Sequence, residues 1–186
     1  MRKVELLDDA TRPSAPRLPG VSTEQRRHGR QLAMIHRLHL AQLAEVRLAM
    51  EQAQSNSAHA ARVQEAVASL DMIASFRTFG NLCGRECQAL TYHHRSEDRE
   101  IFPLVRPVDE GVARVVDRLV AEHAVIEALL ENLVTSAQAL VVEQSTSAFE
   151  ALRDTFSTLE RVVRSHFAYE EVELEEAIGL AAVPFS

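Results

Sequence analysis

Two histidines in this chain are each followed by a glutamate four positions later, His93 by Glu97 and His166 by Glu170. On a helix, residues four apart lie one turn apart on the same face. An imidazole and a carboxylate placed in this way can bind one metal ion together, and the carboxylate can also bridge two ions. If both pairs lie on helices, the spacing predicts a metal site.

The pairs continue apolar stripes instead of lying on polar helix faces. Leu159 and Val163 precede His166 at helical spacing. A buried carboxylate without a partner costs several kcal/mol, and two buried carboxylates that face each other take up protons. Cations placed between Glu97 and Glu170 would remove this cost, so a metal explains the two residues better than packing does.

Further histidines fall on other expected helices. His36 and His39 share the apolar stripe of the first helix, and His123, with Glu127 four positions later, lies on that of the third. An inward histidine taken alone is also typical of a hydrogen-bonded core residue. Their joint placement favours metal, because four histidines are expected in one layer, at heights of about 15–20 Å from the same bundle end: His36, His93, His123 and His166.

Composition and periodicity predict an all-α protein. Hydrophobic residues make up 46% of the 186 residues, and there are only six Gly and six Pro. We predict an up-and-down four-helix bundle with an extra helical segment, over about 60–76, between the first and second main helices. The four main helices are expected over these ranges: from Ser22 or Thr23, with Thr23 as N-cap, to about 54–57; from about Phe76 to Phe102, ended by Pro103 and Pro107; about 109–142; and from Thr146 to a terminating Gly179.

The ends and the charge of the chain limit its partners. Residues 1–21 hold three of the six prolines and no helical period, so we expect a flexible N-terminal arm before a bundle over residues 22–186. The net charge is −7 and basic residues are scattered, which argues against nucleic acid and anionic membranes as partners. No apolar run approaches the ~20 residues of a membrane span. The N-terminus does not resemble a secretory signal, so we expect a cytoplasmic protein.

The two cysteines, Cys83 and Cys87, are four positions apart. On one helix face they have little freedom to reach disulfide geometry, so we interpret them as reduced thiols. Two roles stay open for them, as small core residues or as a redox-sensing pair.

The expected ligands narrow the choice of metal. They are nitrogens and carboxylate oxygens without thiolate, a set that suits iron, manganese or zinc. Two carboxylates able to bridge indicate two ions. Four histidines and two glutamates leave positions open on octahedral iron, where O₂ or peroxide could bind.

These motifs resemble those of hemerythrin-like domains. The run HHRSEDREIFP at 93–103 resembles the HHxxED…FP signature, and AEH at 121–123 is similar to the third-helix EH motif. HFAYEE at 166–171 is similar to the fourth-helix HxxxEE motif, and His36 matches the first-helix histidine. The resemblance covers roughly residues 24–180. It implies a non-haem di-iron site that reacts with O₂ or its reduced products, in a family of oxygen carriers, sensors and proteins acting on peroxide.

The chain departs from the oxygen carriers of that family in its third and fourth helices. Their third helix supplies a second histidine where this chain has Glu127. Their fourth-helix carboxylate corresponds to Glu171, but helical phase favours Glu170, at about 40° from His166 compared with about 140° for Glu171. The more anionic site favours oxidised iron, and therefore chemistry or sensing over reversible O₂ carriage.

Other residues are candidates for alternative or outer positions. His39 is the alternative to His36 on the first helix, and Glu127 and Glu171 are additional or alternative metal ligands. The remaining candidates are neighbours of the ligands: His94 and Asp98, which either orient ligands or are solvated, and Tyr92 and Tyr169 as hydrogen-bond donors or radical traps.

The sequence thus predicts a protein with two iron ions that reacts with O₂, peroxide or another small diatomic ligand. Peroxide decomposition and oxidase-type redox chemistry are the activities expected first. One alternative is a sensor or carrier of O₂, nitric oxide or iron without turnover. Another is a bundle with a structural or zinc-bound core. Since a sensor usually acts through an output domain, the first interpretation is favoured.

Overall fold

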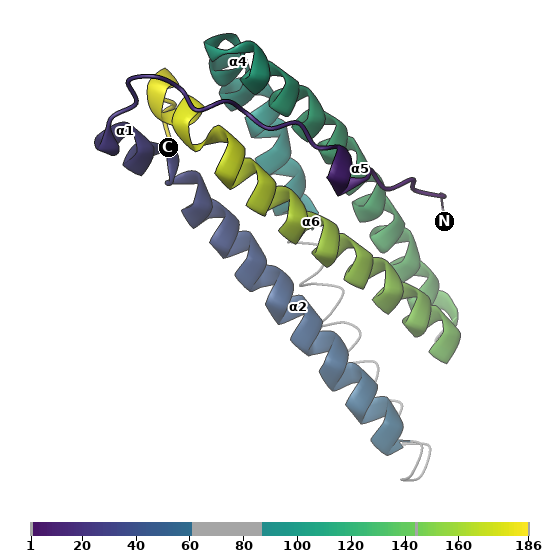
Figure 1. Ribbon diagram of the computed structural model, residues 1–186. Helices are drawn as coiled ribbons and strands as arrows, with labels where there is room; N and C mark the ends of the chain where they lie inside the picture. Colours follow the sequence, from purple (N-terminus) through teal and green to yellow (C-terminus); the bar gives the residue numbers. More distant parts are fainter. Residues whose placement is uncertain (1, 61–86, 144, 186) are drawn as a thin grey trace.

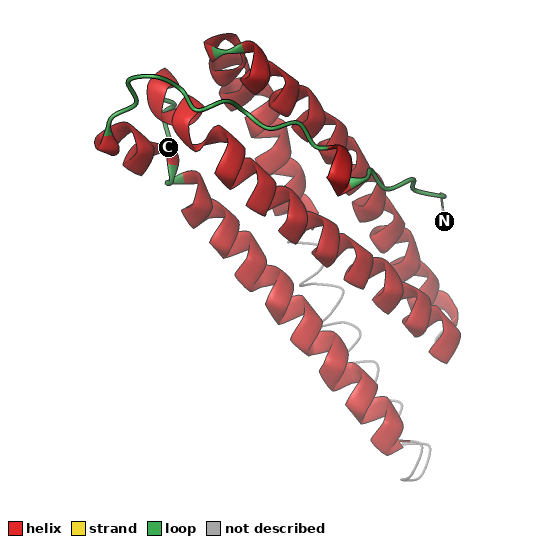
Figure 2. Ribbon diagram, viewed as in Figure 1, coloured by secondary structure: helices red, strands yellow, loops and turns green. Residues whose placement is uncertain are grey.

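A computed structural model of the protein describes residues 2–60, 87–143 and 145–185 (Figure 1). The described ranges are mostly helical and contain no strand, so the expected all-α helical bundle is confirmed (Figure 2). None of the described helices combines the length and apolar character needed to cross a bilayer. The elements in chain order are η1 (Asp9–Thr11), α1 (Thr23–Gly29), α2 (Leu32–Ala60), helical residues 87–96, the π-helix η2 (Glu97–Ile101), α4 (Phe102–Val105), η3 (Arg106–Val108), α5 (Glu110–Glu143) and α6 (Thr146–Ala181).

Four helical stretches run along the bundle: α2, residues 87–105, α5 and α6 (Figure 1). Their inward stripes form two apolar clusters, one around Leu90 and Leu159 and the other around Leu119 and Leu174. All four of these leucines are fully buried. The expected extra segment over 60–76 and Cys83 fall outside the described residues, whereas Cys87 is a buried thiol in the first cluster.

The first expected helix is in fact two helices. Ser22, and not Thr23, is the N-cap of α1, and its side chain forms a capping box with Gln25. The chain then turns at residues 30–31 before α2 begins. The turn lets α1 cross α6 near the end of that helix. The two helices approach so closely that a Cβ on Gly29 would overlap the backbone of Glu175.

The end of α6 also differs from the prediction. Gly179 does not terminate the helix, which continues to Ala181 and closes at Ala182 in the left-handed conformation (φ 48°). Gly179 instead makes the other half of the crossing with α1, since a Cβ there would overlap the carbonyl of Gln25. Glycine is required at this position by the close approach and not by the backbone conformation.

The second main helix changes its winding where Pro103 was expected to end it. Residues Glu97–Ile101 form a π-turn in which the Phe102 amide donates to the Glu97 carbonyl. Pro103 has no amide hydrogen, and in a regular α-helix its ring would clash with the carbonyl four residues earlier. The wider turn accommodates the proline, and the chain continues through α4 and η3 before α5. Such π-turns are frequent at functional sites.

The N-terminal segment, expected to be a flexible arm, packs along α5 and α6 (Figure 1). The hydroxyl of Tyr169 donates to the Pro13 carbonyl at 2.6 Å. The amide of Leu18 donates to Glu176 at 2.7 Å, and the Leu18 side chain is buried. Extended backbone lacks internal hydrogen bonds, so the Tyr169 hydroxyl and the Glu176 carboxylate supply partners that a free arm would find in water.

Candidate metal centre

Buried ligand-type side chains form two clusters in the layer between the two apolar clusters. In each cluster the ligand atoms lie within 4.8 Å of one another. The three-histidine cluster consists of His94, His123 and His166, and the His36 cluster consists of His36, His93 and Glu97. The bundle thus brings residues of α2, the 87–101 stretch, α5 and α6 together in one layer, as the height argument predicted.

Two carboxylates lie between the clusters. Oε1 of Glu97 is 3.1 Å from Nε2 of His93, whereas its Oε2 is 3.6 Å from Nε2 of His123. Oε2 of Glu170 is 3.5 Å from Nε2 of His36 and 3.8 Å from Nε2 of His166. Each carboxylate therefore faces both clusters, which is the arrangement a bridging ligand requires.

Several of the atoms that point into this layer lack hydrogen-bond partners. Among the described residues, these buried side-chain atoms have none: Nε2 of His36, His93 and His94, and both carboxylate oxygens of Glu97 and Glu170. Buried polar atoms are nearly always paired in folded proteins. Lone-pair atoms that converge without donors are what a cation would satisfy, so the residues present fit a metal centre.

Carboxylates on the outside of the layer orient three of the imidazoles. Each ring donates through Nδ1: His123 to Asp98 at 2.8 Å, His166 to Glu122 at 3.0 Å and His36 to Glu171 at 3.0 Å. A ring that donates through Nδ1 presents the lone pair of Nε2 to the opposite side. This is the tautomer a metal-binding histidine needs when Nε2 is the ligand atom.

Aromatic side chains fix the ring planes. Phe167 stacks on His36 with centroids 3.8 Å apart and an interplanar angle of 5°. Phe102 stacks on His123 at 5.4 Å and 13°, and His94 stacks on the same ring at 4.3 Å and 19°. Tight packing leaves the imidazoles few rotamers, so the ligand atoms are held in place before any ion binds.

Burial disfavours the charged forms of His93, His166, Glu97 and Glu170. It lowers the pKa of His93 to about 2, with repulsion from neighbouring histidines adding to the effect. It lowers the pKa of His166 to about 4, although the hydrogen bond to Glu122 acts in the opposite direction. It raises the pKa of Glu170 to about 8, together with the nearby Glu171, and raises that of Glu97 well above the ordinary value. His93 and His166 are therefore neutral at pH 7, while Glu170 is largely protonated without a cation.

The structure distributes the remaining candidates between the two clusters and the shell around them. His94, expected in an outer position, belongs to the three-histidine cluster, whereas its neighbour His93 belongs to the His36 cluster. Asp98 and Glu171 accept hydrogen bonds from clustered histidines. His39 is buried with its ring 4.8 Å from that of His93, but it belongs to neither cluster.

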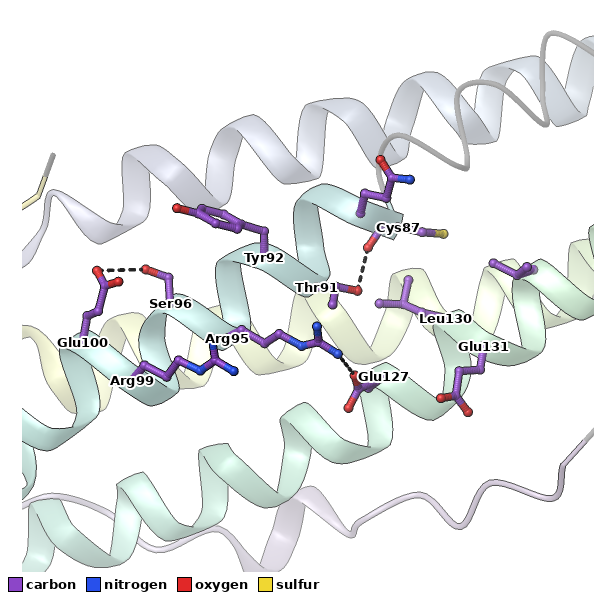
Figure 3. A pocket seen from close by; sticks show the side chains of 12 residues that line it. Cys87, Thr91, Tyr92, Arg95, Ser96, Arg99, Glu100, Glu127, Leu130 and Glu131 are labelled. Carbon is purple, nitrogen blue, oxygen red and sulfur yellow. Dashed lines mark hydrogen bonds and ion pairs between the residues drawn. The ribbon is translucent and has the colours of Figure 1, made fainter.

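Three candidates are directed away from the layer. Glu127 and Tyr92 line an outer groove of about 790 Å³ between residues 87–100 and α5, where Glu127 pairs with Arg95 at 2.8 Å (Figure 3). Tyr92 is 76% exposed. The third is Tyr169, whose hydroxyl donates to the Pro13 carbonyl. Glu127 lies four residues after His123 but faces the outer groove, so this spacing alone was misleading.

Two residues near the centre were not among the predicted site residues, although Glu122 belongs to the AEH motif at 121–123. Glu122 is buried and accepts the Nδ1 hydrogen of His166, and Arg12 of the N-terminal segment donates to both oxygens of Glu122. The position of Glu122 immediately before His123 was the available signal, because neighbouring helical residues point about 100° apart and can serve adjacent helices. No periodicity marks Arg12.

A small pocket reaches the His36 cluster from the surface. Its volume is about 100 Å³, and His93 and Glu97 are among its walls. Leu32 and Ile35 of α2 form another side, and the C-terminal residues 183–185 cover it. At about 30 Å³ per water, the space admits molecules of only a few heavy atoms.

An all-α bundle whose buried histidines and carboxylates converge from four helical stretches defines a cation-binding helical protein. The family model described as Hemerythrin HHE cation binding domain matches residues 27–178. The chain belongs to this hemerythrin family. No curated protein and no solved structure matches it significantly.

Proposed function

We propose that this protein holds two non-haem iron ions and uses them in redox chemistry with O₂ or peroxide. The observation that carries the proposal is Glu97, whose two oxygens face different histidine clusters and have no hydrogen-bond partner. His36 and His93 would hold one ion, and His94, His123 and His166 the other. Glu97 and Glu170 would lie between the ions.

Iron is supported by the donor set. Five imidazoles and two carboxylates, without a thiolate, suit iron as well as manganese or zinc, and dinuclear carboxylate centres in helix bundles are commonly iron or manganese sites. When bound there, iron would supply electrons for reduction of O₂ or peroxide. The His36 cluster has fewer histidines than the three-histidine cluster, so its ion would have more positions open to a small ligand.

The chain's own residues contribute access and exclusion of water. The pocket of about 100 Å³ leads to His93 and Glu97, on the side with fewer histidines. Among the described residues, the two apolar clusters lie on either side of the layer and limit hydration of the site. The size of this pocket suits a substrate of a few atoms.

The test uses protein loaded with Fe²⁺ without air, then exposed to O₂ and, separately, to hydrogen peroxide. The visible spectrum, the iron per chain and the peroxide remaining are recorded. Two irons per chain and catalytic loss of peroxide support the proposal. A coloured form that persists and reverses under vacuum would instead indicate a carrier or sensor. Glu97→Gln should lose iron, whereas the surface variant Glu127→Gln should retain it.

A further inference from the structure

We propose that Arg12, in the extended N-terminal segment, is a positioning residue of the metal centre that acts through Glu122 on His166. The inference rests on the proposed function only in taking His166 as a metal ligand. It assigns a role to a segment that contributes no ligand and lies outside the helices. The geometry gives a continuous chain of contacts from this segment to the ligand layer.

The first link is the bidentate pair between Arg12 and Glu122. Nε of Arg12 lies 2.8 Å from Oε1, and one terminal nitrogen lies 3.0 Å from Oε2. The Arg12 and Glu122 side chains are 14% and 5% exposed, so the pair is largely removed from water. A fork of parallel donors fixes the plane of a carboxylate as well as its charge.

The second link is the hydrogen bond from His166 to the same carboxylate. Nδ1 of His166 donates to Oε2 of Glu122 at 3.0 Å, and His166 itself is fully buried. Because Glu122 is held in plane by Arg12, its oxygen is aimed at Nδ1 and the proton stays there. The lone pair of Nε2 is then directed toward His123 and Glu170 in the ligand layer.

A second arginine shares Glu122 and ties it to the same segment. Nε of Arg118 donates to Oε1 at 2.7 Å, and its terminal nitrogens donate to Thr11 and to the Asp8 carbonyl. Two arginines and one imidazole thus donate to the two oxygens of Glu122. These donors hold the carboxylate in place beside His166.

The position of Arg12 is determined by its own neighbours. Its guanidinium lies 4.6 Å above the ring of Tyr169 and donates to Ser165 at 2.8 Å. The Tyr169 hydroxyl holds the adjacent Pro13 carbonyl. Each of the three guanidinium nitrogens thus donates to a side chain of α5 or α6, which distinguishes Arg12 from a solvated surface arginine.

Loss of Arg12 should alter His166 without removing a ligand. Glu122 would keep Arg118 but lose the fork that fixes its plane, and its negative charge would be less neutralised. The proton on His166 would then be shared more evenly between the ring nitrogens in the metal-free protein. In the iron-loaded protein, loss of the positive charge of Arg12 would favour the more highly charged, oxidised iron, so the reduction potential would fall.

The test compares Arg12→Ala and Arg12→Lys with Arg17→Ala. Arg17 lies on the same segment, but its side chain is 92% exposed and pairs with Glu176, far from the ligands. Imidazole nitrogens are labelled with ¹⁵N, and the His166 tautomer is measured by NMR in metal-free protein. The reduction potential and the iron per chain are measured after loading.

The inference predicts a mixed His166 tautomer and a lower potential for Arg12→Ala, an intermediate result for Arg12→Lys, and wild-type values for Arg17→Ala. Equal values for Arg12→Ala and Arg17→Ala in both measurements would overturn it. If Arg12→Ala does not fold, Arg12→Lys, which keeps the charge but not the fork, gives the same comparison. If wild-type protein binds no iron, the proposed function fails, while the metal-free tautomer still decides the role of Arg12.

Discussion

Nε2 of His123 lies 3.1 Å from Nε2 of His166, deep within the bundle. Each ring donates its Nδ1 hydrogen to a carboxylate, so the two Nε2 atoms confront each other as lone pairs and neither can donate. Two acceptors at this separation repel each other unless a cation lies between or beside them. The contact therefore supports the proposal that an ion binds in this layer.

Metal binding should raise the stability of the fold. An ion that binds only the native state adds about 4 kcal/mol when its free concentration is a thousand times Kd. We expect the thermal midpoint to rise on addition of Fe²⁺ without air and to fall again with a chelator. His123→Gln should lose most of this increase. His28→Gln, which changes a histidine outside the layer, should retain it, and equal increases in the two variants would contradict the ligand assignment.

The stability of the metal-free protein should depend on Glu170 at neutral and alkaline pH. Folding raises the pKa of Glu170 to about 8 from an ordinary value of 4.5, so the folded state favours the protonated carboxyl. The contribution of Glu170 to the free energy of unfolding is complete below about pH 4.5 and is lost as pH rises through about 8. Glu170→Gln should be more stable than wild type at pH 9, by a few kcal/mol at most.

Denaturant unfolding between about pH 5 and 9 measures this effect. Glu127→Gln is the matched control, since Glu127 is an exposed carboxylate paired with Arg95. Parallel pH profiles for wild type and Glu170→Gln would show that Glu170 is ionised in the metal-free fold. With metal added the order should reverse, because the amide is a poorer ligand than the carboxylate.

The crossing of α1 and α6 should tolerate no side chain at Gly179. A methyl group there would overlap the Gln25 carbonyl, so the helices must separate. We expect Gly179→Ala to lower the free energy of unfolding by about 1–3 kcal/mol. Arg27→Ala, on the exposed side of α1, should have little effect. A Gly179→Ala protein as stable as wild type would mean that the crossing is looser than described.

The small pocket beside His93 should control access to the centre. Ile35 lines this pocket, and a tryptophan there would fill much of its roughly 100 Å³. Ile35→Trp should slow the oxidation of reduced iron by peroxide roughly tenfold, about 1.4 kcal/mol in barrier height. Met34→Trp is the control, because Met34 is 60% exposed and does not line the pocket. Equal stopped-flow rates for the two variants would exclude this route.

The ligand layer was predictable because helical spacing is a local property. His93 with Glu97 and His166 with Glu170 are separated by one turn, so one sequence suffices to place each pair on a single face. Placing His36 and His123 at the same height rested on expected helix ends and the rise per residue, although the helix that carries His36 begins at Leu32 and not near Ser22. The structure brings all six of these side chains together.

The parts that were not predictable depend on contacts between distant segments. Arg12 reaches Glu122 across 110 positions, and nothing in the composition of residues 1–21 marks that contact. The break before α2 occurs at residues 30–31, where no proline interrupts the pattern, because α1 docks on α6 through Gly29. The place of His94 beside His123 and His166 depends on how α5 and α6 pack against its helix, which spacing within one helix does not encode.

Anomalous X-ray diffraction at the iron edge, on crystals of protein loaded with Fe²⁺ without air, tests the central claim most directly. We predict two iron peaks per chain. One should lie at Nε2 of His36 and His93, the other at Nε2 of His94, His123 and His166, with Glu97 and Glu170 between them. A single peak, or no peak from protein shown to be folded and exposed to excess iron, would contradict a dinuclear iron centre in this layer.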